Sequence, residues 1–253
     1  MCYINQTLDH RMYSWVGDDP GDLSVVLYCD ADFAREKFPG MKSTNGTFLC
    51  IEGPMTFCTL SGCSKKQGNV SKSTPEAEIV SASYWLEKTG LPALDLWEVL
   101  LRRKPMRIDL QEDNEACLQI MRTGRNPSMK HVSRTHGVNI AWLHAQYAKH
   151  FAGINCHTLL MCADIFTKAF DEKPKWHAAR KLIAHFTIEE FRVFVPPPIP
   201  LSKERGGKSK DSENEENESD NESSGSVGSA SSAGSRTRPQ TKSTNGASAA
   251  SNA

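Results

Sequence analysis

Short apolar runs near the start of the chain are typical of β-strands. Apolar and β-branched residues dominate 23–28, 47–51 and 56–60, and a Gly-Pro turn signal lies between the last two runs. We therefore expect three successive strands, the last two forming a hairpin. Residues 37–45 are polar and contain proline and glycine, which predicts a loop, and the polar run 65–68 is expected to end the hairpin.

Apolar residues then recur at spacings of three and four, which predicts helices. Thr74 is a candidate cap, Pro75 suits the first helical position, and Glu76 follows in the positive first turn. We expect Gly90 and Pro92 to interrupt this helix. Further predicted elements are a short helix ending near residue 101, a strand at 106–113, a helix capped by Asn114, a helix at 132–147, a strand at 151–159, a helix at 161–170 and an amphipathic helix at 176–186. This order predicts an α/β fold in which helices pack on a mixed sheet.

Composition divides the chain of 253 residues into unequal parts. Residues 201–253 contain no aromatic residue, and such a stretch cannot bury enough apolar area to offset the entropy of ordering. We expect a connector at 1–21, the main domain at 22–170, a helical extension at 171–200 and a disordered Ser/Glu-rich tail at 201–253.

Charge and cysteine content narrow the class of protein further. The formal net charge is zero, so any nucleic-acid binding must come from local basic patches. No apolar run is long enough to span a bilayer, and residues 1–10 lack the pattern of a secretory leader. The eight cysteines form no CxxC pair and lie mostly among apolar residues, which favours reduced core thiols over disulfides or zinc. We expect an intracellular protein, cytoplasmic or nuclear, without membrane attachment.

Carboxylates fall where predicted elements begin or end. Asp30 and Asp32 end the first strand, and Asp113 ends the fourth. Sites in open α/β sheets form beyond strand ends. Glu78 lies early in the long helix and Asp164 early in a late one, so one sheet could bring these acids together.

Clustered carboxylates repel one another, by about 4 kcal/mol for unit charges at 4 Å and an effective dielectric of 20. Divalent cations remove that cost, and all-oxygen ligands suit Mg²⁺ or Mn²⁺. Two such ions form the clamp used in phosphodiester hydrolysis.

The geometry of strands and helices selects among neighbouring acids only in part. Asp30 and Asp32 point to the same face of a strand, so alternation does not choose between them, whereas Glu76 and Glu78 point about 200° apart on a helix. Because Glu76 suits the dipole-capping position, we assign Glu78 to the site.

Six motifs occur in one order: YCDADFA at 28–34, KSTNG at 42–46, SKKQ at 64–67, STPEAE at 73–78, EDN at 112–114 and ADIFTK at 163–168. Residues 22–170 thereby resemble the ribonuclease H domain of copia-type LTR retrotransposon Pol polyproteins. The resemblance implies an RNase H-like fold with a five-stranded mixed sheet flanked by helices. It also implies cleavage of the RNA strand of RNA–DNA hybrids with two Mg²⁺ ions, and an original partnership with a reverse transcriptase domain.

Carried over by motif, the catalytic and metal-binding acids are Asp30, Glu78, Asp113 and Asp164. The chain departs from the family at Phe33, where Trp is usual, at Pro75 and at Glu112. We expect Glu112 to point away from Asp113.

Candidate nucleic-acid contacts lie in the same motifs: Ser43, Thr44, Asn45, Lys65, Lys66 and Asn114. In a polar loop, hydroxyl and amide groups such as those of residues 43–45 could bond phosphates or 2′-OH groups. The lysines could bind the backbone, although lysine pairs are as often solubility charges.

Two further interpretations remain beside the nuclease. The chain could be a catalytically silent RNase H-like module that binds nucleic acid or is a non-functional remnant. It could also be a DNA strand transferase of the integrase type, a class that shares the fold implied by the resemblance. The acids of that class run in the order Asp, Asp, Glu, whereas here Glu78 precedes Asp113, which argues against it.

Overall fold

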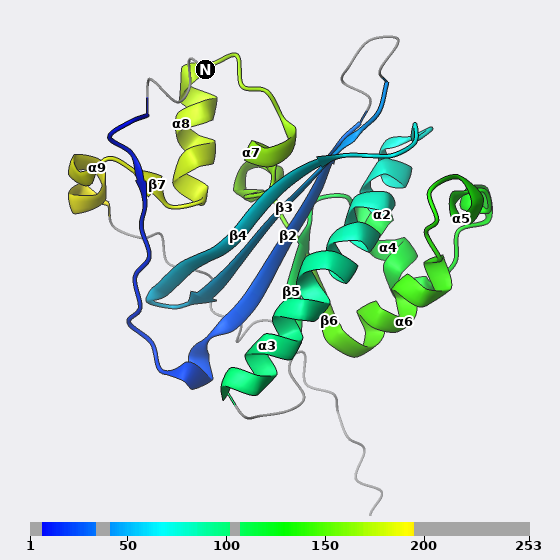
Figure 1. Cartoon of the computed structure of the whole chain (residues 1–253), viewed down its shortest axis with the longest axis horizontal. Coiled ribbons are helices and arrows are strands. Elements are labelled where there is room, and N and C mark those ends of the chain that lie inside the picture. Colours follow the sequence, from blue (N-terminus) through cyan, green and yellow to red (C-terminus); the bar gives the residue numbers. More distant parts are fainter. Residues whose placement is uncertain (1–6, 34–40, 102–106, 195–253) are drawn as a thin grey trace, which may run out of the picture. The chain divides into compact units, whose positions relative to one another are not determined.

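The computed structural model describes residues 7–33, 41–101 and 107–194, and they contain a five-stranded mixed sheet (Figure 1). The strand order is β4-β3-β2-β5-β6. β2 pairs antiparallel with β3, and β3 with β4, whereas β2–β5 and β5–β6 are parallel. The strands are β2 Ser24–Asp32, β3 Thr44–Gly53, β4 Thr56–Lys66, β5 Ile108–Glu112 and β6 Phe151–Asn155. The expected five-stranded mixed sheet flanked by helices is confirmed.

Alternate residues of β2 face two separate cores. Val25, Leu27 and Cys29 pack with one set of helices, whereas Val26 and Tyr28 pack with a second apolar cluster. The first set is α2 Thr74–Trp85, α3 Leu91–Leu101, α4 Glu115–Thr123, α5 Val132–Thr135 and α6 Ile140–His150. The second is α7 Asp164–Thr167, α8 Lys173–Leu182 and α9 Ile188–Val193. Figure 1 shows these two groups on opposite sides of the sheet.

The long helix differs from its prediction at both ends. Ser73, not Thr74, is the N-cap, and its side chain accepts a hydrogen bond from the Glu76 N–H at 3.4 Å. Gly90 does not end the helical path, because a π-helical turn, η2 Leu86–Gly90, connects α2 to α3. Pro92 is the second residue of α3, directly after the π-helical turn.

Three other predicted elements are shorter or divided. The predicted helix 132–147 is two helices, α5 and α6, separated at Gly137, whose φ of 72° is left-handed. Strand β6 ends at Asn155, and Thr158–Leu160 form the short 3-10 helix η4. The predicted helix 161–170 is only the four residues of α7. The remaining 3-10 helices are η1 Pro20–Asp22 and η3 Pro127–Met129.

The hairpin strands extend further than their apolar cores. Thr44 and Asn45 belong to β3, and Lys65 and Lys66 belong to β4, with Asn45 opposite Lys65. The predictions of a loop through Asn45 and of a break at Lys65 are therefore wrong. Pairing with a neighbouring strand satisfies the backbone of these polar residues, and composition alone does not reveal that pairing.

The residues before β2 pack against those after α7. β1 Arg11–Met12 pairs antiparallel with β7 His185–Phe186, so the helix expected at 176–186 ends at Leu182. Trp15 forms a bridge to Phe57 of β4. The tail 201–253 lies outside the described residues.

The seven cysteines among the described residues are all free, and five of them are buried. Within the same part of the chain, no helix combines the length and apolarity needed to cross a bilayer.

Candidate metal centre

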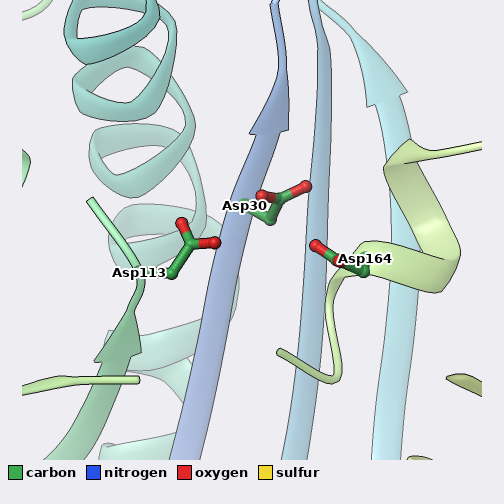
Figure 2. Close-up of side chains that lie close together, drawn as sticks. All are labelled: Asp30, Asp113 and Asp164. Carbon is green, nitrogen blue, oxygen red and sulfur yellow. The ribbon is translucent and has the colours of Figure 1, made fainter. Parts of the chain in front are cut away.

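Three aspartates from distant parts of the sequence meet at one edge of the sheet (Figure 2). Asp30 is near the end of β2, Asp113 directly follows β5, and Asp164 is the first residue of α7. One carboxylate oxygen from each lies within 4.8 Å of the others. Strands β2 and β5 are parallel, with Tyr28 opposite Gln111, so their carboxyl ends reach the same edge.

A second carboxylate group shares Asp113 with the first. Glu78, Glu112 and Asp113 also offer oxygens within 4.8 Å of one another. All four acids chosen from the sequence, Asp30, Glu78, Asp113 and Asp164, therefore belong to two adjoining groups. Their catalytic roles remain predictions.

Glu112 was expected to point away from Asp113, and this expectation is wrong. Strand β5 ends at Glu112, so the alternation of faces does not extend to Asp113. The Glu112 side chain is fully buried, and its Oε1 accepts a hydrogen bond from the Asn114 N–H at 3.2 Å. Glu112 is thus a fifth carboxylate in the site.

Helix α2 separates the roles of its two early glutamates, as the helical period predicts. Glu78 faces the carboxylates, whereas Glu76 contacts two histidines. The Nε2 atoms of His131 and His136 each lie 3.1 Å from a Glu76 carboxylate oxygen. Glu76 therefore attaches the α5 region to the first turn of α2 instead of only capping the helix dipole.

The acids are held in surroundings that disfavour their charge. Burial raises the pKa of Asp30, and burial followed by repulsion from Asp30 raises the pKa of Asp164 to about 6. The pKa of Glu78 is raised well above its ordinary range by burial and then by Glu112. Burial and then Asp113 likewise raise the pKa of Glu112. The site therefore carries more negative charge than its surroundings stabilise.

Residues at the end of α7 and in η4 orient these carboxylates. Thr167 donates a hydrogen bond from its hydroxyl to Oδ2 of Asp30. The Nζ atom of Lys168 lies 2.5 Å from Oδ1 of Asp164 and 3.6 Å from Oδ1 of Asp30. The hydroxyl of Thr158 donates to Oδ2 of Asp113 at 3.1 Å. Sequence reasoning assigned no role to these three residues, although two of them lie in the ADIFTK motif.

The donor set fits a hard divalent cation. Every candidate ligand is a carboxylate oxygen, the type that Mg²⁺ and Mn²⁺ prefer. Glu78 Oε2 and Glu112 Oε2 are buried and have no hydrogen-bond partner among the described residues. A buried carboxylate oxygen without a partner is costly, and a bound cation would satisfy both.

The candidate nucleic-acid contacts divide into buried and exposed residues. The side chains of Ser43 and Asn45 are buried, and Asn45 Oδ1 accepts a hydrogen bond from Gln67 Nε2 at 2.6 Å. Ser43 lies just before β3, whereas Thr44 and Asn45 are paired within it, so the expectation of a polar loop at residues 43–45 is wrong for Thr44 and Asn45. Thr44 is half-buried at the start of β3.

Lys65, Lys66 and Asn114 remain accessible. The Lys65 ammonium donates to the Tyr84 hydroxyl at 2.7 Å, and Lys66 is exposed at the end of β4. Asn114 Oδ1 caps α4 by accepting from the Cys117 N–H at 3.0 Å. Its binding of nucleic acid would therefore depend on its amide nitrogen.

Comparisons with known proteins give structural matches of low similarity. No protein-family model matches the chain, and no curated protein sequence matches it significantly. A crystal structure of LC11-RNase H1 in complex with an RNA/DNA hybrid matches 57% of this chain and 94% of that chain, at 14% identity and a TM-score of 0.36. A second structure of LC11-RNase H1, isolated from compost by a metagenomic approach, matches 57% and 92%, at 16% identity and a TM-score of 0.33. A crystal structure of a prototype foamy virus protease-reverse transcriptase mutant matches 68% of this chain and 22% of that chain, at 14% identity and a TM-score of 0.35.

Proposed function

We propose that this chain is a metal-dependent endoribonuclease that hydrolyses the RNA strand of RNA–DNA hybrids with two divalent cations. The observation that carries the proposal is the pair of carboxylate groups that share Asp113. Two adjoining all-oxygen groups match the requirement of two-metal phosphodiester hydrolysis, in which both cations contact the reacting phosphate. Mg²⁺ is the expected cation, and Mn²⁺ is an alternative of the same ligand preference.

The protein's own residues would hold the acids in place before substrate arrives. Asp30, Asp113 and Asp164 would hold one cation, and Glu78, Glu112 and Asp113 the other. Bound cations of this class would activate a water molecule and stabilise the leaving oxygen. The Thr167 and Thr158 hydroxyls orient Asp30 and Asp113, respectively, so these carboxylates need little rearrangement.

The exposed end of the hairpin supports binding of a nucleic-acid backbone beside the acids. Thr44 lies opposite Asp32 on one side and opposite Lys66 on the other, so Lys66 and the end of β2 reach the same edge of the sheet. We propose Lys65 and Lys66 as phosphate contacts and Thr44 and Asn114 as candidates for the 2′-OH groups that distinguish RNA from DNA.

The six motifs support a more specific origin. We propose that the chain is the RNase H part of the reverse transcription machinery of a copia-type retrotransposon, with a reverse transcriptase domain as its original partner.

Cleavage of a labelled hybrid tests the activity. The full chain is incubated at low salt with Mg²⁺ and an RNA–DNA hybrid labelled on the RNA strand, beside duplex DNA, duplex RNA and single-stranded RNA. We expect cleavage of the hybrid alone and a loss of at least about 1,000-fold in Asp113→Asn, because both carboxylate groups lose their shared member. If wild type and Asp113→Asn are equally inert, the catalytically silent module is the correct interpretation.

A further inference from the structure

Lys168 places a positive charge between two of the candidate metal ligands. Its Nζ atom contacts Oδ1 of Asp164 and Oδ1 of Asp30, at 2.5 and 3.6 Å. The lysine directly follows α7, and its side chain is 30% exposed, so the ammonium reaches the acids from the solvent side. The contact therefore does not require a deeply buried lysine.

The same two aspartates belong to the group that could hold a cation with Asp113. Burial raises the pKa of both aspartates, and repulsion from Asp30 raises the pKa of Asp164 further. The Lys168 ammonium opposes these effects by lowering the pKa of both. A divalent cation on these oxygens would lie within a few ångströms of Nζ. Repulsion between charges of +2 and +1 is twice that between two unit charges at the same distance.

We infer that Lys168 is the resident counter-ion of the acidic site and competes with the divalent cation for Asp30 and Asp164. This inference rests on the proposed function, because it takes those aspartates as metal ligands. Without metal, Lys168 limits the repulsion that would otherwise push α7 away from β2. With metal, the lysine must turn toward solvent, which its partly exposed position allows.

Direct measurement of metal binding tests the competition. Mn²⁺ and Mg²⁺ are titrated into the metal-free full chain by calorimetry, for wild type, Lys168→Met and Lys168→Arg. Lys175→Met is the matched control, because Lys175 forms an exposed pair with Glu172 at 2.8 Å on α8. We expect Lys168→Met to bind Mn²⁺ at least about tenfold more tightly than wild type, while Lys168→Arg and Lys175→Met stay within about threefold.

The outcomes separate this inference from the proposed function. Equal or weaker metal binding by Lys168→Met, together with clear binding by wild type, overturns the competition and leaves the metal site intact. Absence of binding in both wild type and Lys168→Met overturns the metal site and the competition together. If Lys168→Met and Lys168→Arg both bind Mn²⁺ more tightly than wild type, the positive charge is not what competes with the metal, because arginine retains that charge.

A second measurement uses wild-type protein, in case Lys168→Met does not fold. The Lys168 ammonium resonance is followed by ¹⁵N NMR of the side chain and assigned by its loss in Lys168→Arg. We expect an ordered ammonium signal in the metal-free chain and loss of that signal at saturating Mg²⁺. An ammonium resonance unchanged by saturating Mg²⁺ would show that lysine and cation coexist, which overturns the inference.

Discussion

The Thr167 hydroxyl donates a hydrogen bond to Oδ2 of Asp30, although 137 residues separate the two in the chain. This bond connects the end of α7 to β2 and fixes the orientation of a buried carboxylate. It also opposes the effect of burial, because the hydroxyl lowers the pKa of Asp30. Short helix α7 therefore supplies both Asp164 and part of the support for Asp30.

Removal of this hydroxyl is expected to weaken catalysis without disrupting the fold. Thr167→Val keeps the shape of the side chain but loses a hydrogen bond to a charged group, which is worth about 1.5–3 kcal/mol. We expect hybrid cleavage to fall about tenfold and its pH profile to move to higher pH. Steady-state cleavage between pH 5 and 9 measures both effects. Thr123→Val is the control, because its hydroxyl donates to the Gln119 carbonyl in an exposed contact at the end of α4. An equal loss in both variants would contradict the prediction.

Glu112 is expected to cost stability in the metal-free protein and to favour metal binding. The pKa of Glu112 is raised by burial and by Asp113. Glu112 therefore lowers the free energy of unfolding by an amount that grows as pH rises above the pKa of this group in the unfolded chain. We expect Glu112→Gln to raise the free energy of unfolding in EDTA at pH 8, because the amide places no charge in this fully buried position. Its affinity for Mn²⁺ should fall at least about tenfold.

Urea unfolding and calorimetry check the effect of Glu112. Glu115→Gln serves as the comparison, because Glu115 forms an exposed ion pair with Arg122 and should change stability by less than about 1 kcal/mol. Unchanged stability and unchanged Mn²⁺ affinity in Glu112→Gln would rule out its place in the site.

Asp164 gives stability an unusual pH dependence. Its pKa is raised to about 6 by burial and by Asp30, so the folded protein binds more protons than the unfolded chain between pH 3.8 and about 6. The contribution of Asp164 to stability is therefore present at low pH and is lost as pH rises through about 6. In EDTA, we expect Asp164→Asn to be more stable than wild type at pH 7.5 by about 1–3 kcal/mol, and to differ little at pH 4.

Cleavage should have the opposite pH dependence, because only the ionised carboxylate binds a cation. We expect wild-type activity to fall as pH drops from 7 to 5. Asp95→Asn, an exposed change on α3, should leave the pH dependence of stability and the pH dependence of cleavage unchanged. A stability difference between wild type and Asp164→Asn that is the same at pH 4 and 7.5 would contradict the assignment.

Gly46 lets α7 approach the sheet closely. It lies opposite Asp30 in the β2–β3 pair, and a Cβ atom at this position would be 2.9 Å from the Ala163 carbonyl oxygen. Gly46→Ala should push α7 outward, lower stability by about 1–3 kcal/mol and reduce hybrid cleavage at least about tenfold. Gly68→Ala is the matched control, because a Cβ atom added there would meet nothing within 4 Å. Thermal melts and cleavage assays check the pair; wild-type values for Gly46→Ala would show that α7 does not depend on this contact.

The acids at element ends could be predicted because parallel strands bring their carboxyl ends to one edge. That rule indicates Asp113 and either Asp30 or Asp32, and the motif resemblance selects Asp30, whereas Glu78 follows from the helical period. Glu112 could not be placed, because its orientation depends on where β5 stops. The sequence also did not reveal that Thr167 reaches Asp30, since this contact depends on how α7 packs against Gly46.

Local signals identified most elements but not all of their ends. Asn114 caps α4 as expected, because its capping bond needs only the following turn. By contrast, the helical path continues through Gly90, where glycine makes room for Phe151, because a Cβ atom on Gly90 would lie 2.9 Å from the Phe151 ring. A packing partner about 60 residues away is invisible to a pattern read along neighbouring residues.

The pairing of β1 with β7 has a practical consequence for anyone preparing this protein. A fragment cut at residues 22 and 170, the limits that the motifs suggest, would lose Trp15 and Phe186. Trp15 stacks on Phe57 with ring centroids 5.4 Å apart, and Phe186 is fully buried in the cluster that also contains Phe48. Such a fragment would expose aromatic rings to water and tend to aggregate, so expression should retain at least residues 7–194.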